Sequence, residues 1–81
     1  MNELELEIAR QLGASSFLVY SVLKNKGDLT RRDLEIECGM SEDGILRTVK
    51  KLEEDKIITR NGKINRSNLY TITDVLNWRI Q

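Results

Sequence analysis

The segment from Gly39 to Ile58, GMSEDGILRTVKKLEEDKII, carries the clearest pattern in the sequence. Gly39 suits the left-handed turn that closes a helix, and Ser41 is a favoured N-cap for the next helix. Three aliphatic residues then recur at helical spacing, which places them on one face: Ile45, Val49 and Leu52. The segment therefore predicts the end of one helix, a short turn and a second helix that runs to about residue 55.

The residues before this segment predict a helix with its own start signal. Thr30 is a good N-cap, and Asp33 three residues later completes an imperfect capping box. Leu34 and Cys38 share the inner face of this helix. We expect Leu29, just before the cap, to form a brief extended segment.

Two further helices are predicted in the first part of the chain. Residues 2–12 place Leu4, Ile8 and Leu12 at positions i, i+4 and i+8 behind three early glutamates, although the alternation over residues 4–8 also fits a strand. The next helix begins with Ser15 or Ser16 as its N-cap and runs to about residue 25. The side chains that it turns partly toward the core are Phe17, Tyr20, Val22 and Leu23.

The last third of the chain predicts a hairpin. Residues 56–60 and 69–73 are rich in Ile, Thr, Leu and Tyr, and a polar loop, 61–68, separates these two predicted strands. Asn61-Gly62 alone would favour a tight turn, but Ile64 interrupts the polar loop and leaves the register open. Residues 74–81 predict a short C-terminal helix that carries Val75 and Trp78.

Composition places the chain among small globular domains. Its 81 residues suffice for one domain with a small core, so further burial by oligomerisation is expected. No long apolar run could span a bilayer or act as a secretory signal, and we therefore expect a cytoplasmic protein that does not bind membranes. The 13 basic residues balance the 13 acidic ones, which argues against binding to nucleic acid by gross charge alone.

The charges are unevenly distributed along the chain. Residues 28–43 contain six acids and two arginines, a net charge of −4. Residues 56–73 contain four bases and no acid, a net charge of +4. Such polarity can orient a protein on a phosphate backbone, and the alternative is solvated surface charge. For the bases of residues 56–73 we favour a functional role, because they crowd one predicted loop.

Catalytic and metal chemistry have little support in the sequence. The chain has no histidine and a single cysteine, Cys38, so a zinc site and an intramolecular disulfide are not expected. No glycine-rich phosphate loop or arrangement of nucleophile and base is visible. We therefore expect a protein that is not an enzyme and uses no cofactor.

From residue 12 to residue 73 the chain resembles the winged helix-turn-helix domains of bacterial, plasmid and phage DNA-binding proteins. Three segments carry the resemblance: SFLVYSVL at 16–23, the run from 34 to 58, and RSNLYTI at 66–72. The resemblance implies an α+β, mainly α fold, with a three-helix core, a C-terminal β-hairpin wing, and flanking N- and C-terminal helices. Together with chain length and apolar spacing at the termini, this predicts one domain, 1–81, in which 1–13 is the N-terminal helix, 15–73 the winged-helix core and 74–81 the C-terminal helix.

One residue departs from the pattern of this family. A small side chain, usually alanine, is expected where the second helix of the core crosses the third, and the chain has Glu35 there. A carboxylate is costly to bury at a close helix crossing. Either the helix is therefore rotated, or Glu35 must reach solvent or a base such as Arg31.

The resemblance implies that the third helix, residues 41–55, lies in the major groove of double-stranded DNA. The wing, residues 60–68, would follow the backbone or enter the minor groove. Arg47 is the candidate for a guanine, because its planar fork matches O6 and N7. Glu42 and Asp43, at the leading edge of the helix, argue against this hypothesis, because their carboxylates repel phosphates. The full set of candidate DNA-binding residues is Arg31, Arg32, Ser41, Arg47, Thr48, Lys50, Lys51, Arg60, Lys63 and Arg66.

Apolar residues near the two termini suggest a dimer interface. In the alternative interpretation the terminal segments fold back and complete the core of one monomer. We favour a homodimer, because it would present two recognition helices to adjacent half-sites. The candidate interface residues are Leu4, Leu6, Ile8, Val75 and Trp78.

The leading functional hypothesis is a sequence-specific DNA-binding protein that acts as a small transcriptional regulator. A replication or partition factor of a plasmid or phage is a close variant of this hypothesis. The alternative from another class is a non-catalytic interaction module that presents the winged-helix surface to a protein partner. Zero net charge and the acidic segment at 33–43 support that alternative.

Overall fold

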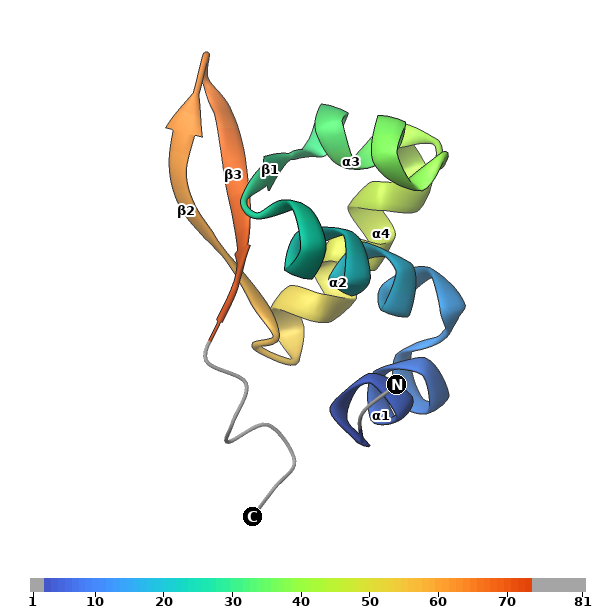
Figure 1. Cartoon of the computed structure of the whole chain (residues 1–81). Helices are drawn as coiled ribbons and strands as arrows, with labels where there is room; N and C mark the ends of the chain where they lie inside the picture. The colour runs from blue at the N-terminus through green and yellow to red at the C-terminus, as the bar shows by residue number, and fades with distance from the viewer. Residues whose placement is uncertain (1–2, 74–81) are drawn as a thin grey trace.

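The computed structural model describes residues 3–73, which form a helical body with a hairpin along one side (Figure 1). The elements, in chain order, are α1 (Glu3–Leu12), α2 (Ala14–Lys26), β1 (Leu29–Thr30), α3 (Arg31–Cys38), α4 (Glu42–Glu54), β2 (Ile58–Ile64) and β3 (Ser67–Ile72). The predicted helix at 74–81 lies outside the described residues. None of the helices within 3–73 has the length and apolar character needed to cross a membrane.

The core lies where α2, α3 and α4 meet the base of the hairpin, and α1 packs on α2 and adds Ile8 to it. The aliphatic stripe predicted for α4 is buried, and Leu34 of α3 is fully buried against it. Tyr20 and Tyr70 are the two aromatic members, and burial raises the pKa of Tyr20. The remaining members of the cluster are Ile8, Val19, Leu23, Ile57 and Ile58. Burial of these side chains holds the helices and the sheet together.

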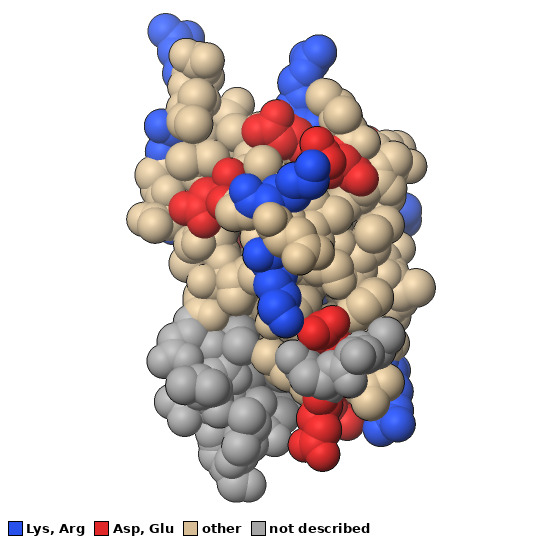
Figure 2. All heavy atoms as spheres, in the orientation of Figure 1, with Lys and Arg blue, Asp and Glu red and all other residues tan. Residues whose placement is uncertain are grey.

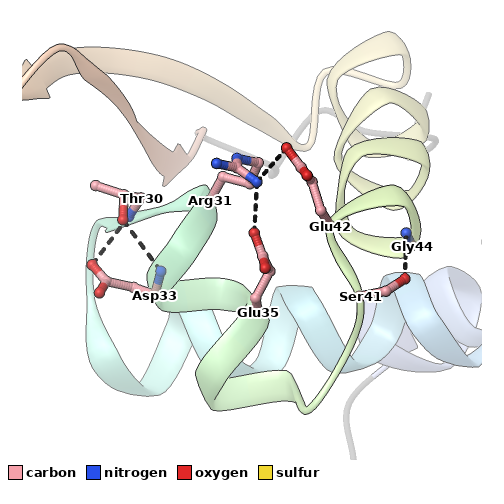
Figure 3. A network of polar contacts seen from close by, with 7 residues as sticks. All are labelled: Thr30, Arg31, Asp33, Glu35, Ser41, Glu42 and Gly44. Atoms are coloured by element: carbon pink, nitrogen blue, oxygen red, sulfur yellow. Dashed lines mark hydrogen bonds and ion pairs between the residues drawn. The ribbon is translucent and has the colours of Figure 1, made fainter.

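The turn between α3 and α4 follows the predicted start and stop signals. Thr30 Oγ1 accepts a hydrogen bond from the backbone N–H of Asp33 at 3.2 Å, and the Asp33 carboxylate accepts one from the Thr30 N–H at 3.4 Å. Gly39 closes α3 in the left-handed conformation, with φ 64°. Ser41 Oγ then accepts from the Gly44 N–H at 3.1 Å and caps α4 (Figure 3). Local chemistry thus fixes both ends of the turn.

The start of α2 differs from the prediction. Gly13 stands at its N-cap with φ 95°, and no side chain caps the helix. Ser16 is buried, and its hydroxyl donates to the Leu12 carbonyl at 3.1 Å. The predicted cap at Ser15 or Ser16 is therefore wrong, because both serines lie inside a helix that begins at Ala14.

The hairpin is longer than predicted and turns at a different place. The sheet is antiparallel with strand order β1-β3-β2, and β1 confirms the brief extended segment at Leu29. The predicted polar loop 61–68 is wrong, because strand pairing continues to Ile64 and Ser67. Only Asn65 and Arg66 form the turn, with φ 50° and 71°. Two central residues with positive φ are the signature of a type I′ hairpin turn.

Asn61-Gly62 forms an irregularity within β2 and not the turn. Arg60 pairs with Tyr70 and Lys63 pairs with Asn68, so β2 contains one more residue than β3 over this interval. Such a bulge increases the local twist of a strand. Gly62 takes φ 86°, which a glycine adopts at little cost.

The connection from α4 to β2 also holds a non-glycine residue with positive φ. Lys56 has φ 62°, and the neighbouring Ile57 N–H donates to the Leu52 carbonyl at 2.9 Å. These features define a Schellman-type helix end, where glycine is the usual residue. Thr73 joins the end of β3 to this connection, because its N–H donates to the Ile57 carbonyl at 2.9 Å.

Candidate nucleic-acid interface

The two faces of α4 have opposite character. One face is fixed in the core, and the other exposes Arg47, Lys50 and Lys51. The hairpin extends beside the helical body and projects past α3 at the end opposite α1 (Figure 1). The candidate basic residues of α4 and of the hairpin therefore belong to two separate elements of the fold.

Thr48 does not belong to the exposed face. It is only 5% exposed, so its predicted outward orientation is wrong. The buried positions of α4 follow the spacing i, i+3, i+4 and i+7, and Thr48 occupies the i+3 position. Burial leaves Thr48 little surface with which to contact a base.

Ser41 and Gly44 mark the start of α4. Ser41 is exposed, but its hydroxyl oxygen already accepts the capping hydrogen bond. A Cβ built on Gly44 would lie 3.3 Å from both Met40 Cε and Ser41 Oγ. The glycine thus allows a close approach within the chain itself, at the turn that leads into α4.

Arg31 links α3 to the start of α4 (Figure 3). Its Nη1 lies 2.7 Å from a Glu35 carboxylate oxygen and 2.6 Å from a Glu42 carboxylate oxygen. The prediction that Glu35 reaches solvent or a base such as Arg31 is confirmed, since Glu35 is half-buried and paired with that arginine. The candidate DNA ligand Arg31 is therefore engaged by two acids.

Arg60 is also paired with an acid. Its Nε lies 3.0 Å from a carboxylate oxygen of Glu53, near the end of α4. This hydrogen bond and the charge of Glu53 raise the pKa of the Arg60 guanidinium above its already high ordinary value. The guanidinium carbon also lies 6.0 Å from the centre of the Tyr70 ring. Arg60 is thereby held over β3, with more than half of its side chain exposed.

The far end of the hairpin carries basic side chains without acids. Lys63 and Arg66 are both exposed there: Arg66 lies in the two-residue turn, and Lys63 lies in β2, two residues before the turn. Figure 2 shows lysine and arginine projecting from this end of the molecule, whereas acidic and basic side chains alternate over the face beside it. Arg32, on the first turn of α3, is exposed as well. These three candidates are accessible to a ligand.

An open cleft of about 330 Å³ separates the hairpin from α3 and α4. Three of the predicted site residues line it together: Arg31, Arg60 and Arg66. Sequence reasoning did not find the other members of the lining, Leu46, Ser67, Asn68 and Tyr70. Their place here depends on the position of the hairpin turn, which the sequence left open.

A second cleft, of about 320 Å³, lies beside α4 on another face. Arg47 and Lys51, one helical turn apart, line it with Ser15, Met40, Gly44 and Thr48. Lys50 does not line either cleft. The candidate basic residues that line a cleft are thus divided between two recesses, and Lys50 is exposed outside both.

The described members of the predicted dimer set differ in their exposure. Ile8 is completely buried in the monomer, so its assignment to an interface is wrong. Leu4 is half-buried and packs against the core, whereas Leu6 is 38% exposed. Val75 and Trp78 lie outside the described residues. Leu6 is therefore the described candidate with the most free apolar surface.

Cys38 is a half-buried free thiol on the inner face of α3. Burial raises its pKa, and the neighbouring Glu37 carboxylate adds to this effect. A thiol of this kind is protonated at neutral pH and a poor nucleophile. Among residues 3–73 no cluster of three or more potential metal ligands occurs.

Comparison with known proteins gives matches at the level of structure. No family model matches the chain, and no curated protein sequence matches it. The chain is similar to a MarR/EmrR family transcriptional regulator from Acinetobacter sp. ADP1, with 27% identity, a TM-score of 0.72, and coverage of 88% of this chain and 53% of that one. It is also similar to RV1404 from Mycobacterium tuberculosis, with 19% identity, a TM-score of 0.77, and coverage of 86% and 49%.

A third similar structure is BpsR from Bordetella bronchiseptica, described in a study of how 6-hydroxynicotinic acid regulates its DNA binding. The identity is 20%, the TM-score is 0.72, and the match covers 79% of this chain and 46% of that one. The chain thus spans about half the length of these solved structures. Together with the order of helices and strands, the matches show that this chain has the winged helix-turn-helix fold.

Proposed function

We propose that this chain is a sequence-specific double-stranded DNA-binding protein that acts as a small transcriptional regulator in the cytoplasm. In this proposal α4 lies in the major groove, and the β2–β3 hairpin contacts the backbone or the minor groove. The observation that carries it is the set of exposed bases on α4, Arg47, Lys50 and Lys51, beside a hairpin with a basic, acid-free end. Two of the similar structures are described as a transcriptional regulator and as a DNA-binding protein, which supports the same reading.

The exposed basic residues of α4 and the hairpin have different roles in this proposal. Arg47 reads a guanine, because its guanidinium can donate to O6 and N7 at once. Lys50 and Lys51 bind phosphates on either side of the groove. Lys63 and Arg66 bind the flanking backbone, where they supply affinity without reading sequence. The chain uses no cofactor and performs no catalysis in this role.

Selection from a random pool of duplex DNA tests the proposal. The retained fraction is sequenced at two salt concentrations, and we expect enrichment of an inverted repeat with half-sites about one helical turn apart. Arg47→Gln should then cost about 1–3 kcal/mol of binding free energy and relax the preference at one base pair. Arg10→Gln is the matched control, because Arg10 is an exposed arginine on α1, far from the hairpin end.

Two outcomes would contradict this function. Retention that vanishes as salt rises, with no enriched sequence, would indicate backbone attraction alone. An equal loss of affinity in Arg47→Gln and Arg10→Gln would remove α4 from the reading role. In the first case the interaction with a protein partner becomes the leading function.

We also propose that the protein acts as a homodimer through α1 and the C-terminal residues. The support is the exposed Leu6 on α1 and the small size of the core. Leu6→Glu should shift sedimentation toward the monomer, whereas Leu18→Glu, at an equally exposed leucine of α2, should not. Equal sedimentation of the two variants and the unmodified chain would place any interface elsewhere.

A further inference from the structure

The cleft between the hairpin and the helix-turn-helix gathers three guanidinium groups from three different elements. Arg31 comes from the start of α3, Arg60 from β2 and Arg66 from the hairpin turn. Ser67 and Asn68 add a hydroxyl and an amide to the same lining. A cleft with this set of donors suits a phosphate oxyanion, which arginine recognises with paired N–H groups.

Acids already occupy two of these three arginines. Glu42 and Glu35 share Nη1 of Arg31, and Glu53 binds Nε of Arg60. Arg66 forms no ion pair among the described residues. The cleft in this state therefore has an overall charge close to zero, although three arginines line it.

Glu42 is the most exchangeable of these acids. Its side chain is 60% exposed, compared with 26% for Glu35 and 25% for Glu53. Its carboxylate approaches Arg31 from the first turn of α4, the element proposed to meet DNA (Figure 3). A phosphate that enters the cleft offers Arg31 the same kind of oxyanion, so the two compete for one donor.

We propose that this cleft binds one phosphate group through Arg31, Arg60 and Arg66, and that the Glu42 carboxylate occupies Arg31 until the phosphate displaces it. In DNA binding, which rests on the function proposed above, the phosphate belongs to the backbone beside the major groove. Glu42 then sets how readily the backbone engages the cleft. Arg31 thus connects Glu42, at the start of α4, with the phosphate that the two hairpin arginines also bind.

Asp43 provides the matched control for Glu42. Both acids lie in the first turn of α4 and are exposed, but only Glu42 is ion-paired with Arg31. Glu42→Gln and Asp43→Asn each remove one negative charge from the same helix end, so their general electrostatic effects are similar. A difference between the two variants therefore reports on the contact with Arg31.

The first experiment titrates each variant with inorganic phosphate alone and follows the arginine Nε–Hε signals by NMR. We expect the signals of Arg31 and Arg66 to shift, and Glu42→Gln to bind phosphate about three- to tenfold more tightly than the unmodified chain. Asp43→Asn should change this affinity by less than about twofold. In the double variant Arg31→Gln with Glu42→Gln the gain should disappear.

The second experiment repeats the comparison with the selected duplex. The same order of affinities with DNA assigns the phosphate to the backbone. Tighter phosphate binding in Glu42→Gln, without any duplex binding, would keep the phosphate site and overturn the DNA-binding function. Equal gains in Glu42→Gln and Asp43→Asn, or a gain that survives Arg31→Gln, would overturn the phosphate site while leaving duplex binding by α4 intact.

Discussion

Replacing Arg66 by glycine should stabilise the fold and weaken DNA binding at the same time. Arg66 has φ 71° at the second central position of the hairpin turn, where glycine is the preferred residue. A left-handed conformation costs a residue with a Cβ about 1–2 kcal/mol. Glycine avoids that cost but loses about 0.4–1 kcal/mol through the larger entropy of the unfolded chain. The net expectation for Arg66→Gly is a stabilisation of about 0.5–1 kcal/mol.

The effect on DNA has the opposite sign. Removing the guanidinium deletes one proposed phosphate contact, so the slope of log K against log salt should become shallower by about 0.9. Unfolding in urea measures the first effect, and fluorescence anisotropy with the selected duplex at several salt concentrations measures the second. Circular dichroism of both proteins checks that the secondary structure is unchanged.

Asn65→Gly is the control for this pair of measurements. Asn65 has φ 50° in the same turn, so the substitution relieves a similar conformation without removing charge. Because asparagine tolerates this conformation, its gain in stability should be smaller than that of Arg66→Gly, and its salt slope should equal that of the unmodified chain. A loss of stability in Arg66→Gly, or a salt slope that stays the same, would refute the corresponding half of the reasoning.

Three further substitutions or treatments probe the fold. Lys56→Gly should raise the free energy of unfolding by about 0.5–1 kcal/mol, because φ 62° at this helix end favours glycine; urea unfolding with an unchanged or lowered midpoint would contradict this. Thr30→Ala should lower it by about 1 kcal/mol through loss of the cap of α3, whereas Thr59→Ala, at an exposed strand position, should cost less. Cys38 should react with iodoacetamide more slowly in the folded protein than in urea at pH 8, because burial raises its pKa. Because the raised pKa belongs to the folded state, the folded protein keeps the thiol proton to higher pH than the unfolded chain does. The contribution of this thiol to the free energy of unfolding is therefore fully present below the pKa of the unfolded thiol, and it is lost as pH rises through the pKa of the folded thiol. Equal rates in both states would show that the thiol is not protected.

The helix-turn-helix could be predicted because its signals are local. Thr30 with Asp33, Gly39, and Ser41 each act within three or four residues of their own position, and the structure shows them in the expected roles. The cap of α2 could not be predicted in the same way. A single glycine joins α1 to α2, and both serines that resemble caps fall inside the second helix. Ser16 is instead satisfied by a carbonyl of α1.

The hairpin register was beyond sequence reasoning for a related reason. Asn61-Gly62 is the stronger turn signal, but the structure uses it as a bulge and turns at Asn65-Arg66. Pairing of β3 with both β1 and β2, together with burial of Ile58 and Tyr70, sets the register. The pairing of β1 with β3 joins distant parts of the chain. These contacts stabilise the register, although it requires positive φ at Asn65 and Arg66. The lining of the cleft could not be predicted without these contacts.

Burial on α1 and α4 follows the position of a residue in the helical stripe and not the polarity of its side chain. A stripe that faces a core normally includes the i+3 position, and on α4 this position is Thr48, whose hydroxyl suggested exposure. Ile8 shows the reverse error, because an apolar residue on a terminal helix suggested an interface, whereas α1 uses it to complete the core of the monomer. A small domain has few apolar residues available, so those at the centre of a stripe are needed for its own core.

The pairing of acids with two arginines changes what the neutral composition implies. Glu35 and Glu42 offset Arg31, and Glu53 offsets Arg60, so a part of the acidic content lies directly on the proposed DNA surface. Exchanging a carboxylate for a phosphate on the same guanidinium gains little electrostatic energy. Backbone attraction alone would then hold the protein weakly on arbitrary DNA, and a duplex whose bases fit α4 would have to supply the remainder. In a protein that must find one site among many, low affinity for other sequences raises the specificity ratio. A net charge of zero is therefore compatible with sequence-specific binding. The order of duplex affinities among the unmodified chain, Glu42→Gln and Asp43→Asn tests this explanation.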